Sequence, residues 1–310
     1  MIRNSNTPKI FILTLIICLL NGSLIDPDSF TQELTEGIEI KGGSLILFEE
    51  YTATWCQICA EIEPDIEELT TKNNDRVALV KLHPSDGIDE LGNYASSKRI
   101  LSLFNNSLKQ TPTFVLDGDV VFEGAPTMSQ LNSMILQTQS KKSNFTEMIF
   151  SVKRINQTIN FEIEISNNIS GIINIMILEN KVTSNSPDGD LKKYDHILKE
   201  MLSINTSNND SMNNNEQWGF EINKSESGIK LVATFIIEGD INIENLGFIA
   251  SHEVMKENHT TVLGAVKIIQ GLENPSKYNN TIPIFLIFLA LGIFASLGFL
   301  ERKNESDVEE

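Results

Sequence analysis

The chain is poor in cysteine, with three among its 310 residues. Cys18 lies in an apolar N-terminal stretch, which leaves only Cys56 and Cys59 beyond it. A disulfide-stapled secreted scaffold carries more pairs, and a structural zinc site needs four ligands, usually with a second cysteine pair. The composition therefore argues against both, and we expect no metal and no organic cofactor. A bridge between cysteines three apart constrains little of the unfolded chain, so its value is chemical rather than structural.

Basic residues are also scarce, with 24 Lys and Arg against 42 Asp and Glu and a formal net charge of -18. An acidic surface repels phosphate groups. The balance thus argues against nucleic acid and anionic lipid headgroups as partners.

Long apolar runs occur only near the two ends. Residues 10–20 follow Arg3 and Lys9 and precede small residues. This order predicts a signal peptide over 1–23, because the run is too short to cross a bilayer. The alternative is a retained short anchor.

The second run, residues 282–300, carries no charge and is long enough to span a membrane as a helix. Arg302 and Lys303 follow it directly, which predicts a cytoplasmic tail over 301–310. Residues from about 24 to 281 would then be extracytoplasmic. A buried core helix is the alternative, although the run is apolar on every side.

After a polar lead-in at 24–41, residues 42–140 alternate between strand and helix patterns. Ile62, Ile66 and Leu69 share one helical face, and Asp117-Gly118 between apolar runs is typical of a hairpin. The predicted order is β-α-β-α-β-β-α, with strands at 44–52, 77–82, 113–116 and 120–123 and helices at 59–71, 93–105 and 128–138.

Residues 145–272 favour strands. Residues 158–166 alternate strictly between apolar and polar side chains, which indicates a strand with one buried face. Several short strands at this spacing predict a β-sandwich, immunoglobulin-like in kind. The other expected strands are 147–153, 171–179, 228–237, 246–251 and 261–269, with a short helix at 194–202 and a mobile loop at 203–215.

The pair Cys56 and Cys59 carries the chemistry. A thiol attacks only as thiolate, and the unpaired N–H groups at a helix start stabilise that anion. Cys56 would be the exposed nucleophile, and Cys59, one helical turn inside, would resolve the mixed disulfide.

The segment Trp55-Cys56-Gln57-Ile58-Cys59 resembles the active site of the thioredoxin family, and the likeness extends over about residues 42–140. Pro64 lies five residues after the second cysteine, where that family kinks its active-site helix. The resemblance implies an α/β thioredoxin-like domain. The intervening Gln57-Ile58 departs from the family's usual pairs, so the direction of electron flow stays open.

The resemblance also implies roles for four further residues. Glu50 lies six residues before Cys56, where the family carries a buried acid that takes a proton from the resolving thiol. Thr111-Pro112 resembles the cis-proline segment that pairs with substrate backbone, and Trp55 would flank the exposed sulfur. The alternative for Glu50 is an ordinary carboxylate at a strand edge.

The second region faintly resembles the immunoglobulin-like half of Omp28-type secreted proteins, in its segments 178–180, 194–196 and 262–269. His196 is a candidate site residue on this likeness. The commoner explanation of the pattern is a surface histidine that begins a short helix.

These features predict a membrane-anchored, extracytoplasmic thiol-disulfide oxidoreductase that acts on protein thiols and disulfides. The tail 301–310 has no cysteine, so a separate redox protein must exchange electrons with the site. Two alternatives stay open: a cell-surface binding module that uses a thioredoxin-like scaffold, and Cu(I) handling by the two thiols.

Overall fold

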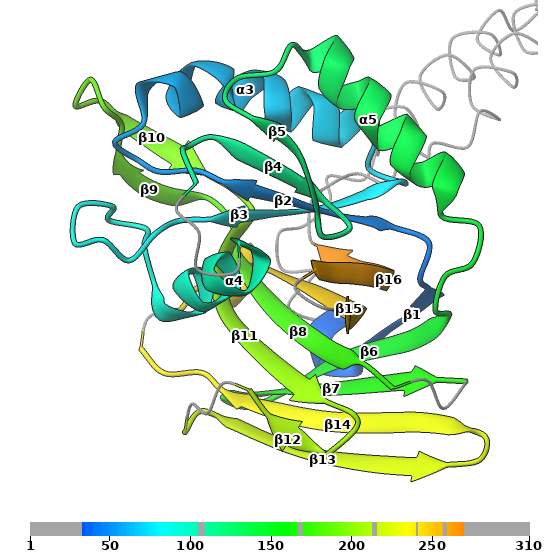
Figure 1. Ribbon diagram of the computed structural model, residues 1–310. Coiled ribbons are helices and arrows are strands. Elements are labelled where there is room, and N and C mark those ends of the chain that lie inside the picture. The colour runs from blue at the N-terminus through cyan, green and yellow to red at the C-terminus, as the bar shows by residue number, and fades with distance from the viewer. Residues whose placement is uncertain are drawn as a thin grey trace, which may run out of the picture. The chain divides into compact units, whose positions relative to one another are not determined.

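The computed structural model describes residues 33–104, 109–166, 170–212, 216–239, 241–256 and 259–269. These residues form a mixed α/β fold that consists mostly of strands (Figure 1). A nine-stranded sheet runs in the order β16-β15-β8-β11-β3-β2-β4-β5, with β12 paired to β11. A five-stranded sheet has the order β1-β6-β7-β14-β13, and β9 and β10 form a hairpin of their own.

The first half contains every element that the sequence predicts for it, in the predicted order. In this half β2 runs parallel to β3 and antiparallel to β4, while α3 and α5 lie on one face of these strands and α4 on the other (Figure 1). The elements are β2 (Ile46–Tyr51), α3 (Gln57–Lys72), β3 (Val77–Leu82), α4 (Tyr94–Phe104), β4 (Thr113–Leu116), β5 (Asp119–Glu123) and α5 (Met128–Lys141).

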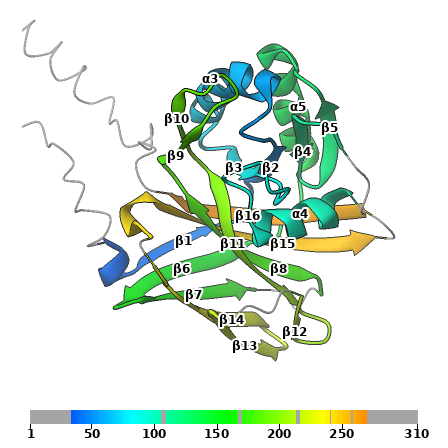
Figure 2. The same cartoon turned by 90° about the vertical axis from the view of Figure 1, so that its left-hand side faces the viewer.

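The second half is a β-sandwich. Its five-stranded sheet faces the β16-β15-β8-β11 part of the large sheet across a core that contains Phe161, Phe235 and Phe248 (Figure 2). Alternate residues of β7 are buried, as the sequence pattern predicts. The strands are β1 (Ile38–Gly42), β6 (Met148–Ile155), β7 (Thr158–Ile165), β8 (Ile172–Glu179), β9 (Val182–Asn185), β10 (Leu191–Tyr194), β11 (Ile197–Asn205), β12 (Asp210–Ser211), β13 (Trp218–Ser225), β14 (Gly228–Ile236), β15 (Leu246–Lys256) and β16 (His259–Ile269).

The two halves are joined by a shared sheet and by buried contacts, not only by a linker. The pair Ile197 and Lys81 joins β11 to β3 in parallel, and this makes the large sheet continuous. Residues 38–42, expected in the polar lead-in, form β1 and pair with β6 of the sandwich. The buried guanidinium of Arg99 on α4 bonds the carboxylates of Glu49 on β2 and Glu253 on β15.

The predicted helix over 194–202 is wrong, because this segment contains the start of β11. A bulge between Leu198 and Glu200 shifts the register against β8, so the apolar residues lose the two-residue period of a strand. The expected loop 203–215 likewise contains the end of β11 and the short β12. The sequence prediction also missed β9, β10 and β13.

The predicted signal peptide at 1–23, membrane helix at 282–300 and tail at 301–310 lie outside the described residues. Within the described ranges, no helix combines the length and the apolar character that a membrane crossing requires.

Candidate redox site

The Cys56–Cys59 pair forms a disulfide at the start of α3. Cys56 is the N-cap residue of the helix, and the backbone N–H of Cys59 donates to its Sγ at 3.2 Å. This donor is one of the unpaired N–H groups of the first turn, and with the helix dipole it would stabilise a thiolate on Cys56 after reduction. The structure therefore supplies the electrostatic setting that the sequence motif predicts.

The sulfurs are less accessible than the motif suggests. Cys56 is 7% exposed and Cys59 is 2% exposed, and both pack against Ala53 in a small buried cluster. Cys56 is thus not an exposed tip, although it is the more accessible of the two. Pro64 lies inside α3, at the position where the thioredoxin likeness placed it.

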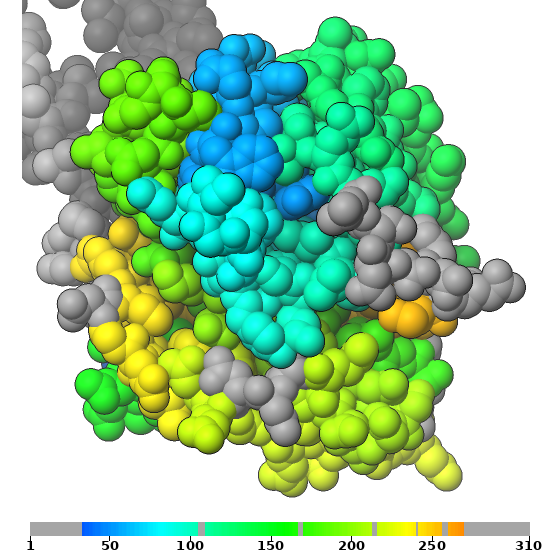
Figure 3. All heavy atoms as spheres, turned by 60° about the vertical axis from the view of Figure 1, so that its left-hand side comes forward, coloured from blue at the N-terminus to red at the C-terminus, as the bar shows by residue number. Residues whose placement is uncertain are grey.

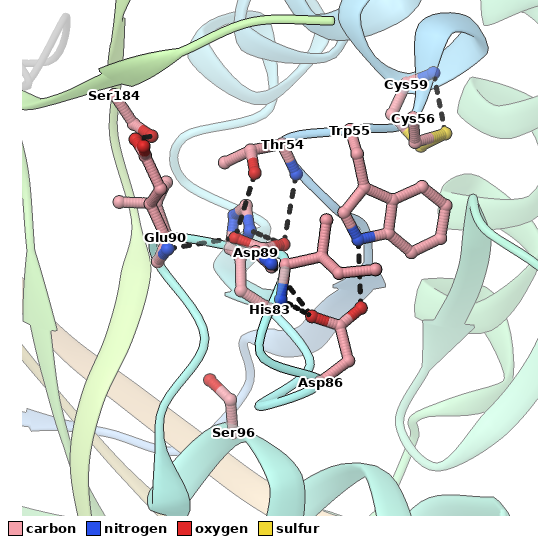
Figure 4. Close-up of polar contacts among 12 residues, drawn as sticks. Thr54, Trp55, Cys56, Cys59, His83, Asp86, Asp89, Glu90, Ser96 and Ser184 are labelled. Atoms are coloured by element: carbon pink, nitrogen blue, oxygen red, sulfur yellow. Dashed lines mark hydrogen bonds and ion pairs between the residues drawn. A yellow bond between two sulfur atoms is a disulfide. The ribbon is translucent and has the colours of Figure 1, made fainter.

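Trp55 stands beside the disulfide and is held by the loop that follows β3 (Figure 4). Its Nε1 donates to Asp86 Oδ2 at 2.9 Å, and the indole remains 43% exposed. The other oxygen of Asp86 accepts the backbone N–H groups of Ile88 and Asp89, each at 2.8 Å. The tryptophan that precedes Cys56 is therefore fixed in position and still faces solvent.

A second set of bonds ties the same loop to the chain just before Cys56 (Figure 4). The Asp89 carboxylate accepts the backbone N–H of Thr54 at 3.0 Å and its hydroxyl at 3.2 Å. It also contacts Nδ1 of His83 at 2.9 Å, and both side chains are buried. The segment that carries the cysteines is thus held on a polar support that the sequence pattern did not predict.

Glu50 is completely buried and faces α3, on the same side of β2 as Ile46 and Phe48. Neither oxygen of its carboxyl group has a hydrogen-bond partner among the described residues. Burial, with Glu63 nearby, raises its pKa to about 8 even though Lys81 opposes the shift. Glu50 is therefore no ordinary carboxylate at a strand edge. It is an acid that is mostly protonated at neutral pH.

Lys81 lies opposite Glu50 on β3 and is also fully buried. Its ammonium group forms ion pairs with Glu63 and Glu67, two neighbours on one face of α3. Burial alone would raise the pKa of Glu67, but Lys81 and His196 lower it to about 2. A lysine within the apolar run VALVKL was the sequence signal that could have revealed this cluster.

The Thr111-Pro112 segment lies beside the end of β2 from which the chain leads to the disulfide. The Thr111-Pro112 peptide bond is cis, and Pro112 directly precedes β4. Thr113, the first residue of β4, pairs with Tyr51, the last residue of β2, and the chain then leads to Cys56. The buried Pro112 accepts the N–H of Gly124 at its carbonyl, at 2.8 Å.

His196 is not the surface residue that begins a helix. It is 3% exposed, has a left-handed backbone with φ 61°, and precedes β11. Its Nε2 lies 3.5 Å from Oε2 of Glu67 on α3. The structure therefore brings His196 to the charged cluster behind the disulfide, whereas no group of three or more His, Cys, Asp or Glu in the described ranges is arranged to hold a metal ion.

The described residues thus contain a thioredoxin-like scaffold that carries a CxxC disulfide. Neither protein-family models nor curated proteins match the chain by sequence. Among solved structures, HBP35 of Porphyromonas gingivalis matches with a TM-score of 0.56 and 14% identity, over 74% of this chain and 76% of that one. Protein AGR_C_4864 of Agrobacterium tumefaciens matches with a TM-score of 0.52 and 13% identity, over 73% of this chain and 94% of that one.

At these identities the likeness concerns the fold. The thioredoxin-like half makes up about a third of this chain, so both matches extend into the strand-rich half. The exposed lipoprotein thioredoxin Etrx1 of Streptococcus pneumoniae covers 32% of this chain with a TM-score of 0.25, which is too low to support an argument.

Proposed function

We propose that the chain is a membrane-anchored, extracytoplasmic thiol-disulfide oxidoreductase that acts on protein thiols and disulfides. The observation that carries the proposal is the Cys56–Cys59 disulfide at the N-terminus of α3, where a backbone N–H already points at Cys56 Sγ. A separate redox protein would restore the site after each turnover, and residues 282–300 would hold the chain in the membrane.

In the reducing direction, the Cys56 thiolate attacks a substrate disulfide, forms a mixed disulfide and releases one substrate thiolate. Cys59 then loses its proton, attacks Sγ of Cys56 and releases the second substrate thiolate. Two electrons pass from the two protein thiols to the substrate, and the Cys56–Cys59 disulfide reforms. Oxidation of a substrate dithiol follows the same steps in reverse.

The resolving step needs a base, because Cys59 lies in a buried position and its thiol must ionise to attack. Glu50 is the buried carboxyl group on the α3 side of β2, and it is not tied up by any hydrogen bond among the described residues. With its pKa raised to about 8, it can exchange a proton near neutral pH. We assign it the role of proton acceptor for Cys59.

Substrate contact would involve Trp55 and the Thr111-Pro112 segment. The partly exposed indole offers an apolar surface next to Cys56, and Asp86 fixes its orientation. The cis-proline segment at the same end of the sheet would lie along the substrate backbone.

Reduction of insulin disulfides by the full chain tests the activity, with Cys56→Ser as the matched variant. We expect turnover in the parent and none in the variant. Cys59→Ser should instead trap a mixed disulfide that survives gel electrophoresis without reductant. A folded parent that neither reduces insulin nor oxidises a reduced protein substrate would refute the enzyme and favour a binding module.

Membrane fractionation tests the anchoring separately. The full chain should sediment with membranes, whereas a chain that ends before residue 282 should be released into the extracytoplasmic fraction. Equal sedimentation of the two chains would refute the anchor without affecting the redox proposal.

A further inference from the structure

Two buried polar side chains, from the last residue of β10 and from the turn before β11, lie against the redox half of the fold. His196 is 3% exposed and Tyr194 is 6% exposed. Within the described residues, His196 Nδ1 and the Tyr194 hydroxyl have no hydrogen-bond partner. The Tyr194 ring lies edge-on to His83, with ring centroids 6.1 Å apart. Unpartnered buried polar groups cost free energy, so their position calls for a functional explanation.

The backbone conformation and hydrogen bonds of His196 hold its side chain in this buried position. The residue has φ 61°, a conformation that costs energy for a non-glycine residue and that clusters at functional sites. Its N–H donates to Asn180 Oδ1 at 2.8 Å, and its carbonyl accepts the N–H of Lys81 at 2.8 Å. The one residue pair that joins β11 to β3 follows at Ile197 and Lys81. The two halves therefore meet at the lysine of the charged cluster.

The side chain then reaches the cluster from the opposite side to β2. Its Nε2 lies 3.5 Å from Oε2 of Glu67, whose other oxygen pairs with Lys81. The charged groups that act electrostatically on Glu50 are Glu63 and Glu67 from α3 and Lys81 from β3. Three carboxyl groups thus compete for one ammonium group, and His196 supplies a second N–H donor for one of them.

We propose that His196 is a positioning residue of the redox centre, which holds Glu67 beside Lys81 and so controls how readily Glu50 accepts the proton of Cys59. The inference rests on the proposed function, and it gives the strand-rich half a part in the redox chemistry. Figure 3 shows the β9–β10 hairpin adjoining the start of α3 and the loop after β3 on one face of the molecule. Glu90 in that loop also accepts a hydrogen bond from Ser184 of β9 at 2.7 Å.

The sign of the effect follows from the charges. Without the imidazole, the carboxylate of Glu67 depends on Lys81 alone and pairs with it more closely. The ammonium group then stabilises the ionised form of Glu50 less. Glu50 then ionises only at higher pH, so it can accept the Cys59 proton only at higher pH. The attack by Cys56 comes before this proton transfer and should not change.

The test follows the reduced full chain as it reacts with a chromogenic aromatic disulfide. Attack by Cys56 releases the first aromatic thiolate, and attack by Cys59 releases the second, so the two steps appear as two phases of absorbance. In the variant His196→Asn the side chain is too short to contact Glu67, while asparagine tolerates the left-handed backbone. The matched control is His252→Asn, a buried histidine of β15 that bonds Thr146 instead.

We expect the pH profile of the second phase to move upward by about half to one unit in His196→Asn, with the first phase changed less than about twofold. Glu67→Gln removes a repelling charge, so it should move the profile downward. His196→Asn should have no further effect in the Glu67→Gln background. The control should match the parent.

An unmoved profile in a folded His196→Asn variant would overturn the proposal, as would an equal shift in His252→Asn. Should His196→Asn fail to fold, Glu67→Gln decides, and an unchanged profile there overturns the proposal. If the parent lacks two phases that depend on Cys56, the proposed function has failed instead.

Discussion

The buried carboxyl group of Glu50 should make the free energy of unfolding depend on pH. Its pKa is raised from 4.5 to about 8, chiefly by burial. An acid with a raised pKa in the folded state binds more protons when folded, so stability falls as pH rises between the two values. At about 1.4 kcal/mol per pH unit, an ionised Glu50 costs about 5 kcal/mol above pH 8.

The substitution Glu50→Gln keeps the shape of the side chain and removes the titration. At pH 5 the parent and the variant should have similar free energies of unfolding, because Glu50 is then protonated in the folded state. Between pH 5 and pH 8 the variant should gain about 4 kcal/mol relative to the parent. Urea unfolding of the full chain in mild detergent, with the disulfide intact and tryptophan fluorescence as signal, measures the difference.

Glu39→Gln, at an exposed glutamate of β1, is the control and should show no such pH-dependent gain. Parallel stability curves for the parent and Glu50→Gln across this pH range would refute the assignment of Glu50 as a buried acid with a raised pKa. The same variant should also slow the resolving step in the two-phase assay, since the proton acceptor is gone.

Two further predictions concern the contacts between the halves. Arg99→Ala should lower the free energy of unfolding by about 3–5 kcal/mol in urea melts, because Glu49 and Glu253 would stay buried without their cation; a loss under about 1 kcal/mol would contradict this. Gly118→Ala should cost more than about 1 kcal/mol, since φ is +93° and an added Cβ would lie 1.9 Å from the carbonyl oxygen of Thr260. Unchanged melting of that variant would show that the backbone can shift there.

Several features could be predicted from local sequence because they depend on few residues. The Cys56-to-Cys59 spacing places two sulfurs one helical turn apart, and the structure joins them at the start of α3. The alternation at 158–165 gives β7, because a strand with one buried face has a period of two. The seven elements of the first half have clear periods and turn signals, and all seven are present.

The charged cluster of Lys81, Glu63, Glu67 and His196 could not be predicted, because its members meet only through the tertiary fold. Lys81 and His196 are far apart in sequence, and the pairing of β11 with β3 brings them together. The bulge in β11 gives that strand a helix-like pattern, so the sequence favoured a surface position for His196 over its role as a site residue.

Short-range spacing and periodicity are enough to predict the Cys56–Cys59 pair and the elements that carry it. The charges around Glu50, and the partner that the strand-rich half supplies for one of them, depend on how distant segments pack. Burial and the distance between charges control these pKa values, and both arise when separate segments pack together.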